Sequence, residues 1–189
     1  MRIVAGRFRG RAITSGVAEG TRPTSDRVRE AIFNVLAHGL DRDVVEGAHV
    51  LDLFAGTGAL TLEAMSRGAG SAVCVEQNAK AFAALKDNVS AFGLASEVVV
   101  RKADATRFAA ETDARPFSLI FLDPPYGRGL AEAALLNLAA RPAVAASAVA
   151  VIEEAASADV ALPAPWSVLQ ARTYGGTTIR FAQYGGDVA

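Results

Sequence analysis

Short β-forming runs alternate with helical stretches through most of the chain, and no other feature of the sequence constrains the fold as strongly. The expected strands are residues 50–54, 72–76, 98–102, 119–123 and 148–153, and the expected helices are residues 60–67, 79–91 and 130–140. Strands joined through helices form βαβ units, in which the strands run parallel and the helices cover both faces of the sheet. The sequence therefore predicts an α/β fold around a mostly parallel sheet.

Both ends of the chain depart from this alternation. Residues 1–14 place Arg and Gly between short apolar pairs, which predicts a small β-hairpin with an arginine-bearing face. A loop is expected next, followed by a helix with Thr24 or Ser25 as its N-cap and Asp26 in its first turn. Residues 166–184 predict a second hairpin around Gly175 and Gly176, which would add an antiparallel edge to the sheet. We therefore divide the chain into an N-terminal extension, residues 1–40, and a main domain, residues 41–189.

The composition is that of an ordinary globular protein, with 51% hydrophobic and 21% charged residues in a chain of 189. The longest uncharged apolar stretch, residues 142–152, is much shorter than the roughly 20 residues that span a bilayer, and the arginine-rich start has no apolar signal segment. Cys74 is the only cysteine and there are two histidines, so neither a disulfide framework nor a metal site is expected. We expect a cytoplasmic monomer that uses no metal and no membrane.

A glycine-bearing turn follows the first expected strand. The strand letters VLDLF run into AGTGAL, so Gly56, Thr57 and Gly58 lie where a ligand meets the carboxyl ends of parallel strands and a helix N-terminus. Glu76 ends the next strand, where a carboxylate can accept hydrogen bonds from both hydroxyls of a ribose. Asp104 follows the third strand. This series predicts a site for a nucleoside-containing cofactor.

Three classes of cofactor could use such a turn. A dinucleotide enzyme would share Glu76, but the third position of its glycine fingerprint is Thr61 here rather than Gly or Ala. The phosphate-loop pattern with Lys and Ser or Thr is missing from the sequence, which disfavours nucleotide triphosphate hydrolysis. Asp52, four residues before Gly56, lies where a carboxylate can hold the α-amino group of a methionine moiety. The pattern therefore favours S-adenosylmethionine.

The segment Asp123-Pro124-Pro125-Tyr126 ends the fourth expected strand. Its prolines lack backbone donors and have a fixed φ, so they form a stiff turn whose carbonyls are free to accept hydrogen bonds. The N–H bonds of an exocyclic amine could then point at the Asp123 carboxylate and the Pro124 carbonyl, leaving the nitrogen lone pair to face a sulfonium methyl group. Tyr126 offers a ring on which an extruded base can stack. The alternative is an ordinary proline turn, with Asp123 capping it and Tyr126 in the core.

Arginines gather in the first thirty residues. This segment contains seven arginines and three acidic residues, Glu19, Asp26 and Glu30, so its local charge is +4 in a chain whose net charge is −1. Salt bridges to backbone phosphates position a nucleic acid without reading its sequence, so this cluster fits an RNA-binding arm. The alternative is a solvated hairpin face. The expected RNA-binding residues are Arg2, Arg7, Arg9, Arg11 and Arg22, with Arg128 just past the proline turn.

Several segments together resemble the bacterial RsmD family of class I methyltransferases. They are IVAGRFRGR, TRPTSDRVREAIFNVL, VLDLFAGTGALTLEAMSRGA and FLDPPY, with the ending Tyr174-Gly175-Gly176 and Arg180-Phe181. The resemblance covers residues 1–184. It implies a Rossmann-like fold with a seven-stranded sheet and methylation, by S-adenosylmethionine, of the N2 amino group of a guanine in 16S ribosomal RNA. The substrate would be the RNA itself, the small ribosomal subunit or an assembly intermediate.

The resemblance also implies roles for individual residues. Asp52, Phe54, Gly56, Thr57 and Gly58 would line the methionine side of the cofactor site, Glu76 would hold the ribose, and Asp104 with the Ala105 amide would read the adenine. Asp123, Pro124, Pro125 and Tyr126 would handle the target base, and the segment from Thr24 to Arg29 would lie near the cofactor carboxylate. Some family members carry Phe in place of Tyr126, which implies stacking rather than a catalytic hydroxyl.

Two other functions share parts of this pattern. DNA adenine-N6 methylation uses the same Asp-Pro-Pro-Tyr core, but a long insertion able to grip duplex DNA is missing from this sequence. A non-catalytic RNA-binding factor in ribosome assembly would keep the fold, and it would keep its function after Asp123→Ala.

Overall fold

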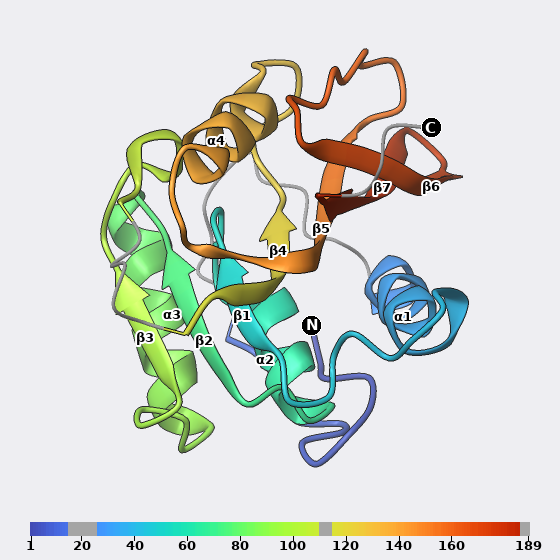
Figure 1. Cartoon of the computed structure of the whole chain (residues 1–189). Coiled ribbons are helices and arrows are strands. Elements are labelled where there is room, and N and C mark those ends of the chain that lie inside the picture. Colours follow the sequence, from blue (N-terminus) through green and yellow to red (C-terminus); the bar gives the residue numbers. More distant parts are fainter. Residues whose placement is uncertain (15–25, 110–114, 186–189) are drawn as a thin grey trace.

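The protein is described by a computed structural model that covers residues 1–14, 26–109 and 115–185 (Figure 1). Within these ranges, one seven-stranded sheet has the strand order β3-β2-β1-β4-β5-β7-β6. The strands are β1 (His49–Asp52), β2 (Ser71–Val75), β3 (Val98–Arg101), β4 (Phe117–Leu122), β5 (Val144–Ala155), β6 (Trp166–Tyr174) and β7 (Thr177–Tyr184). Strands β1 to β5 pair in parallel, while β7 pairs antiparallel with both β5 and β6. The expected parallel sheet and its antiparallel edge are confirmed.

Helices cover both faces of the sheet. They are α1 (Asp26–Asn34), continued by the π-helical turn η1 (Val35–Gly39), α2 (Ala59–Ser66), α3 (Ala79–Ala91), the 3-10 turn η2 (Ala105–Arg107) and α4 (Leu130–Ala139). Leu62 and Leu85 pack with Val50 in one core cluster, whereas Leu135 and Leu51 belong to a second cluster on the opposite face. Successive residues of a strand point to opposite faces, so strands that are covered on both sides read as continuous apolar runs.

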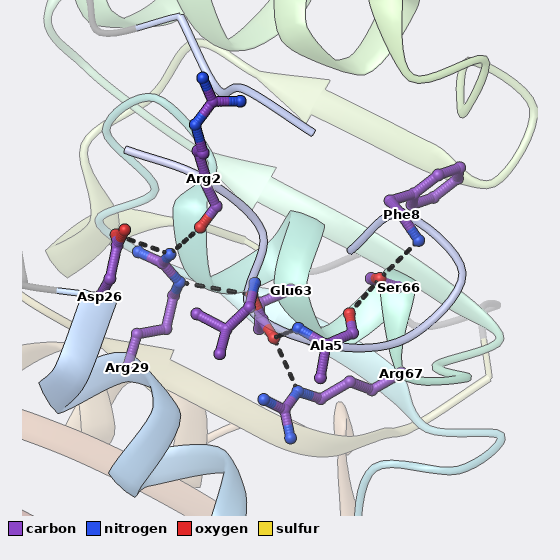
Figure 2. A network of polar contacts seen from close by, with 9 residues as sticks. Arg2, Ala5, Phe8, Asp26, Arg29, Glu63, Ser66 and Arg67 are labelled. Atoms are coloured by element: carbon purple, nitrogen blue, oxygen red, sulfur yellow. Dashed lines mark hydrogen bonds and ion pairs between the residues drawn. The ribbon is translucent and has the colours of Figure 1, made fainter. Parts of the chain in front are cut away.

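The N-terminal ribbon, residues 1–14, forms a very short version of the hairpin that the sequence predicts. Its two arms meet at an antiparallel bridge between Arg2 and Ala12, where Ile3 N donates to Arg11 O at 3.0 Å and Ile13 N donates to Met1 O at 3.1 Å. The ribbon is also attached to α2, because Val4 N and Ala5 N donate to the two carboxylate oxygens of Glu63, at 2.8 and 3.0 Å. Figure 2 shows this network around Glu63. The ribbon is therefore held both by the pairing of its own arms and by a helix.

Glycine is required where the ribbon passes α2. Gly6 has a φ of +81°, and a Cβ placed on it would lie 1.9 Å from the carbonyl oxygen of Ser66. Ser66 is also the acceptor for the Arg7 amide, at 2.8 Å, through that same carbonyl. Ile3 and Ile13 of the ribbon, with Phe33 of α1, lie in the same core cluster as Val50 of β1. The expected N-terminal extension thus shares a core with the expected main domain.

Candidate active site

The loops that follow β1, β2 and β4 meet at one edge of the sheet. Leu53 N, just after β1, donates to Phe121 O of β4 at 3.1 Å, and Ala55 N donates to Val75 O of β2 at 3.1 Å. Glu76 N donates in turn to Arg101 O, the last residue of β3, at 3.1 Å. Parallel strands end at the same edge, so the glycine turn, Glu76 and the Asp-Pro-Pro-Tyr segment are brought together there. This edge is the place where open α/β sheets bind ligands.

The glycine turn is closed by Glu76. Gly56 and Gly58 both have a left-handed φ, +55° and +88°. The Gly56 amide donates to Glu76 Oε2 at 2.9 Å, and the Asn78 amide donates to Oε1 at 2.6 Å. A Cβ on Gly56 would meet no atom within 4 Å, so the space above it is open. A carboxylate oxygen can accept more than one hydrogen bond, so Glu76 can hold the turn and still accept from a ribose.

Asp52 lies beneath the glycine turn rather than at its open side. Its side chain is 1% exposed, and Oδ2 accepts a hydrogen bond from the Thr61 hydroxyl at 2.8 Å. Among the described residues, the other oxygen, Oδ1, lacks a well-aligned donor. Burial, only partly offset by the Thr61 hydrogen bond, raises the pKa of Asp52 to about 7. A buried carboxylate with a spare acceptor suits a nearby ammonium group, although this one is enclosed more deeply than the sequence suggests.

Asn88 of α3 holds the turn from its other side. Its side-chain amide donates to the carbonyls of Thr57 and Thr14, at 2.9 and 3.0 Å, and its oxygen accepts from the Thr14 amide at 3.0 Å. The buried Asn88 therefore ties the expected cofactor residue Thr57 to the N-terminal ribbon. Phe54 is half-buried against the second core cluster, beside the turn.

Asp104 caps the 3-10 turn that follows β3. Its Oδ1 accepts from the hydroxyl and the amide of Thr106, at 2.8 and 2.9 Å, and these hydrogen bonds hold the pKa of Asp104 below its ordinary value. The carboxylate is exposed, whereas the Ala105 side chain is buried. Together with Glu76, this anchored acceptor fits a ligand that carries ribose hydroxyls and a nucleobase amine.

The Asp-Pro-Pro-Tyr turn leaves its tyrosine ring accessible. Pro124 is buried and Asp123 is half-buried, but Tyr126 is 36% exposed. The Tyr126 hydroxyl donates to Glu153 Oε1 at 2.7 Å and lies 3.2 Å from Thr177 Oγ1. Burial of the hydroxyl, together with the adjacent Glu153 carboxylate, raises the pKa of Tyr126, so the phenol stays protonated. The alternative in which Tyr126 packs in the core is wrong, because more than a third of the side chain faces solvent.

Two of the four arginines of the ribbon lie at the opposite edge of the sheet. Arg7 forms a 2.8 Å ion pair with Glu97, which directly precedes β3 and therefore lies at the amino end of the parallel strands. Arg11 donates to the Ala91 carbonyl and lies 4.4 Å from the centre of the Phe92 ring, at the far end of α3. Both side chains thus have structural partners away from the proline turn.

The remaining predicted arginines differ in their surroundings. Arg2 and Arg9 are exposed and line a surface hollow of about 340 Å³ beside the start of α1, together with Arg27. Arg2 also donates to the Gly10 carbonyl at 2.9 Å. Arg128 is exposed two residues after Tyr126, and it is the predicted arginine nearest in sequence to the proline turn. Thr24 and Arg22 lie outside the described residues.

Arg29 ends the segment that was expected near the cofactor carboxylate, and it is fully buried instead. Its Nη2 donates to Asp26 Oδ1 at 3.0 Å and to the Arg2 carbonyl, and its Nε lies 3.5 Å from Glu63 Oε2 (Figure 2). Arg67 completes the cluster, with Nε 2.7 Å from Glu63 Oε1. Arg29 therefore joins α1, α2 and the ribbon.

Membrane-spanning helices and metal clusters are both absent from the described residues. No helix in the ranges 1–14, 26–109 and 115–185 is long and apolar enough to cross a membrane. In that same part of the chain, no three side chains of His, Cys, Asp or Glu are grouped so that they could bind a metal. Cys74 is buried, 3.2 Å from the Thr61 hydroxyl, and burial raises the pKa of its thiol.

Comparisons with known proteins assign the family. The family model described as conserved hypothetical protein 95 matches residues 1–183. The chain is 35% identical to the ribosomal RNA small subunit methyltransferase D of Escherichia coli, over 97% of this chain and 89% of that protein. The protein of the same name from Haemophilus influenzae is 32% identical, over 97% of this chain and 93% of that protein. The chain belongs to the RsmD family.

Solved structures agree with this assignment. The Escherichia coli protein yhhF is 35% identical and superposes with a TM-score of 0.84, covering 97% of each chain. An RNA methyltransferase from Salinibacter ruber, solved with S-adenosyl-L-homocysteine, is 17% identical with a TM-score of 0.65, covering 89% of this chain and 97% of that chain, so it supports the fold alone. The RsmD-family chain has the class I methyltransferase fold that the sequence predicts.

In this RsmD-family chain, sequence reasoning missed the residues that hydrogen-bond to Tyr126 and to the backbone that follows it. Glu153 and Thr177 contact the Tyr126 hydroxyl, and Glu154 Oε1 accepts from the Gly127 amide at 3.0 Å. One signal in the sequence could have identified the two glutamates: they directly follow the apolar run of residues 148–152, and two adjacent carboxylates are unusual at the end of a buried strand. Thr177, the other contact of the Tyr126 hydroxyl, becomes adjacent only when β7 pairs with β5.

Proposed function

We propose that this protein transfers a methyl group from S-adenosylmethionine to the exocyclic N2 amino group of a guanine in 16S ribosomal RNA. The observation that carries the proposal is the meeting of the Asp-Pro-Pro-Tyr turn with the glycine turn and Glu76 at one edge of the sheet. The names of the RsmD relatives from Escherichia coli and Haemophilus influenzae, ribosomal RNA small subunit methyltransferase D, support an RNA substrate.

The cofactor would be held by groups that are already fixed. Glu76 would accept from the ribose hydroxyls, Asp104 and the Ala105 amide would contact the adenine, and the open side of Gly56 would allow close approach of the methionine portion. The buried Asp52, with its spare Oδ1, would face the ammonium charge from below, directly or through a water. When bound, S-adenosylmethionine supplies an electrophilic methyl group on a sulfonium centre.

The target amine would be oriented by the proline turn. The Asp123 carboxylate and the Pro124 carbonyl would accept the two N–H bonds, so the nitrogen lone pair points away from them and towards the methyl group. The nitrogen takes the methyl group with S-adenosylhomocysteine as the leaving group, so positive charge develops on the nitrogen. The Asp123 carboxylate would stabilise that charge until one N–H proton is lost to solvent. The exposed Tyr126 ring would stack on the extruded base, which by comparison with single-strand binders contributes about 1–3 kcal/mol.

RNA would be held mainly by Arg128, which is exposed just after the turn, and by Arg9, which lines the hollow near α1. Arg2 lines the same hollow but also donates to the Gly10 carbonyl. Because Arg7 and Arg11 already pair with Glu97 and with the Ala91 carbonyl, we expect smaller contributions to RNA binding from them.

The test is methyl transfer from labelled S-adenosylmethionine to 16S ribosomal RNA, free and in the small subunit, and separately to duplex DNA, followed by identification of the modified nucleoside. We expect N2-methylguanine, and Asp123→Ala should lose transfer while keeping cofactor binding. The matched control is Asp87→Ala, which removes an exposed carboxylate on α3. Methylation of adenine N6 in DNA instead would establish the alternative function, and equal turnover by Asp123→Ala would remove that residue from the mechanism.

A further inference from the structure

Two adjacent carboxylates of β5 hold the turn that carries Tyr126. Glu153 and Glu154 are only 6% and 3% exposed, although charged residues are rarely buried without a structural or functional reason. Glu153 Oε1 accepts the Tyr126 hydroxyl at 2.7 Å, while Glu154 Oε1 accepts the Gly127 and Ala155 amides at 3.0 and 2.8 Å. The tyrosine is therefore fixed through its hydroxyl and also through the backbone that follows it.

The third support comes from β7. Thr177 pairs with Ala155 in the antiparallel register of β5 and β7, and this places its hydroxyl 3.2 Å from that of Tyr126. The backbone of Tyr126 thus lies in the loop after β4, and its hydroxyl contacts residues at the end of β5 and the start of β7. These contacts fix the direction of the ring axis, from the backbone to the hydroxyl, while 36% of the residue stays exposed.

We propose that Glu153 is a positioning residue, which holds the Tyr126 ring through its hydroxyl as a rigid platform for the target base, with Thr177 as the second support. This inference rests on the proposed methyl transfer. A side chain that is 6% exposed is too enclosed to bind the base itself, so Glu153 acts through Tyr126. An aromatic platform fixed before the base arrives avoids the cost of ordering the ring on binding, and it keeps the amine in line with the methyl group.

The first measurement examines the contact without depending on activity. Tyrosine labelled with ¹³C at Cζ reports the hydrogen bonding of each phenol through its chemical shift at neutral pH, and Tyr126→Phe identifies the Tyr126 signal. Because Glu153 Oε1 accepts from the Tyr126 hydroxyl at 2.7 Å, Glu153→Gln should shift the Tyr126 signal. Tyr184, which packs against Trp166 with ring centres 5.0 Å apart, provides an internal reference signal that should not move. An unchanged Tyr126 signal in Glu153→Gln would overturn the inference.

The second measurement separates positioning from a purely structural role. With the wild-type protein transferring methyl groups to its RNA, Tyr126→Phe should lower kcat about threefold to tenfold, the range that corresponds to loss of one hydrogen bond. The Kd for S-adenosylmethionine should stay unchanged. Glu153→Gln keeps an acceptor oxygen and should lose less, and the double variant should be no slower than Tyr126→Phe alone, because both changes act on one interaction. Tyr184→Phe should match the wild type.

The outcomes distinguish the two proposals. Absence of methyl transfer to RNA by the wild-type protein would refute the proposed function. With an active wild type, a full-speed Tyr126→Phe variant or losses that multiply in the double variant would refute the positioning role of Glu153 and leave the proposed function standing.

Discussion

Replacing Glu63 by glutamine tests the buried network that attaches the N-terminal ribbon to α2. Glu63 is fully buried and accepts four hydrogen bonds, from the amides of Val4 and Ala5 and from the guanidinium groups of Arg29 and Arg67 (Figure 2). Glutamine has one acceptor oxygen where glutamate has two. Its amide group would face one backbone donor and one guanidinium donor, so two of the four hydrogen bonds are lost.

The magnitude follows from those two bonds. A neutral hydrogen bond contributes about 0.5–1.5 kcal/mol and one to a charged group about 1.5–3 kcal/mol, which together give about 2–4.5 kcal/mol. The fully buried Arg29 also loses its buried counter-charge, and breaking such a pair costs about 3–5 kcal/mol. We therefore expect Glu63→Gln to lower the free energy of unfolding by about 3–5 kcal/mol. With a urea m-value of about 2 kcal/mol/M, the midpoint falls by about 1.5–2.5 M.

The assay is urea unfolding, with Glu97→Gln as the matched control. Glu97 makes the same kind of pair with Arg7, at 2.8 Å, but the two side chains are 37% and 50% exposed. Exposed pairs contribute about 0–1 kcal/mol, so the control should shift the midpoint by less than about 0.5 M. Equal midpoints for the two variants would contradict the reasoning that burial, and not pairing alone, makes the Glu63 network matter.

Three further predictions concern the site. Gly58→Ala should lower the free energy of unfolding by about 2–5 kcal/mol, because φ is +88° and the new Cβ would lie 2.5 Å from Leu85 Cδ1. Gly47→Ala is the control: its φ is +67° but no atom lies within 4 Å, so it should cost only the strain of the left-handed backbone. Equal losses for the two variants would show that the contact with Leu85 contributes nothing. Burial raises the pKa of Asp52 to about 7, so the folded state favours the neutral carboxyl group. The free energy of unfolding of the wild type, measured relative to that of Asp52→Asn, should therefore fall as the pH rises from about 4 to about 7. A difference that stays constant over this pH range would refute the raised pKa. Arg128→Ala should weaken RNA binding and reduce the slope of its salt dependence by about one, and an unchanged slope in filter-binding titrations would remove Arg128 from the phosphate contacts.

The order of strands and helices and the location of the site could be predicted from local patterns. Apolar runs with β-forming residues identify strands that are covered on both faces, and the ligand edge of such a sheet is always the carboxyl edge of its strands. The glycine turn, Glu76 and the Asp-Pro-Pro-Tyr segment each follow directly on a strand, so their meeting at one edge required no knowledge of packing. The antiparallel hairpin of β6 and β7 was also predictable from local sequence, because a glycine pair marks its turn.

The partners of these residues were decided by tertiary structure alone. A hydrogen bond such as that from Tyr126 to Glu153 joins residues 27 apart, and Thr177 joins them only through the register of β7 on β5. The hairpin of the ribbon was likewise predictable from its own pattern, but its attachment to Glu63 of α2 through the Val4 and Ala5 amides was not. Local sequence determines which backbone shape and which exposed or buried face each segment prefers, whereas the donor that meets each buried acceptor depends on which distant segments pack side by side.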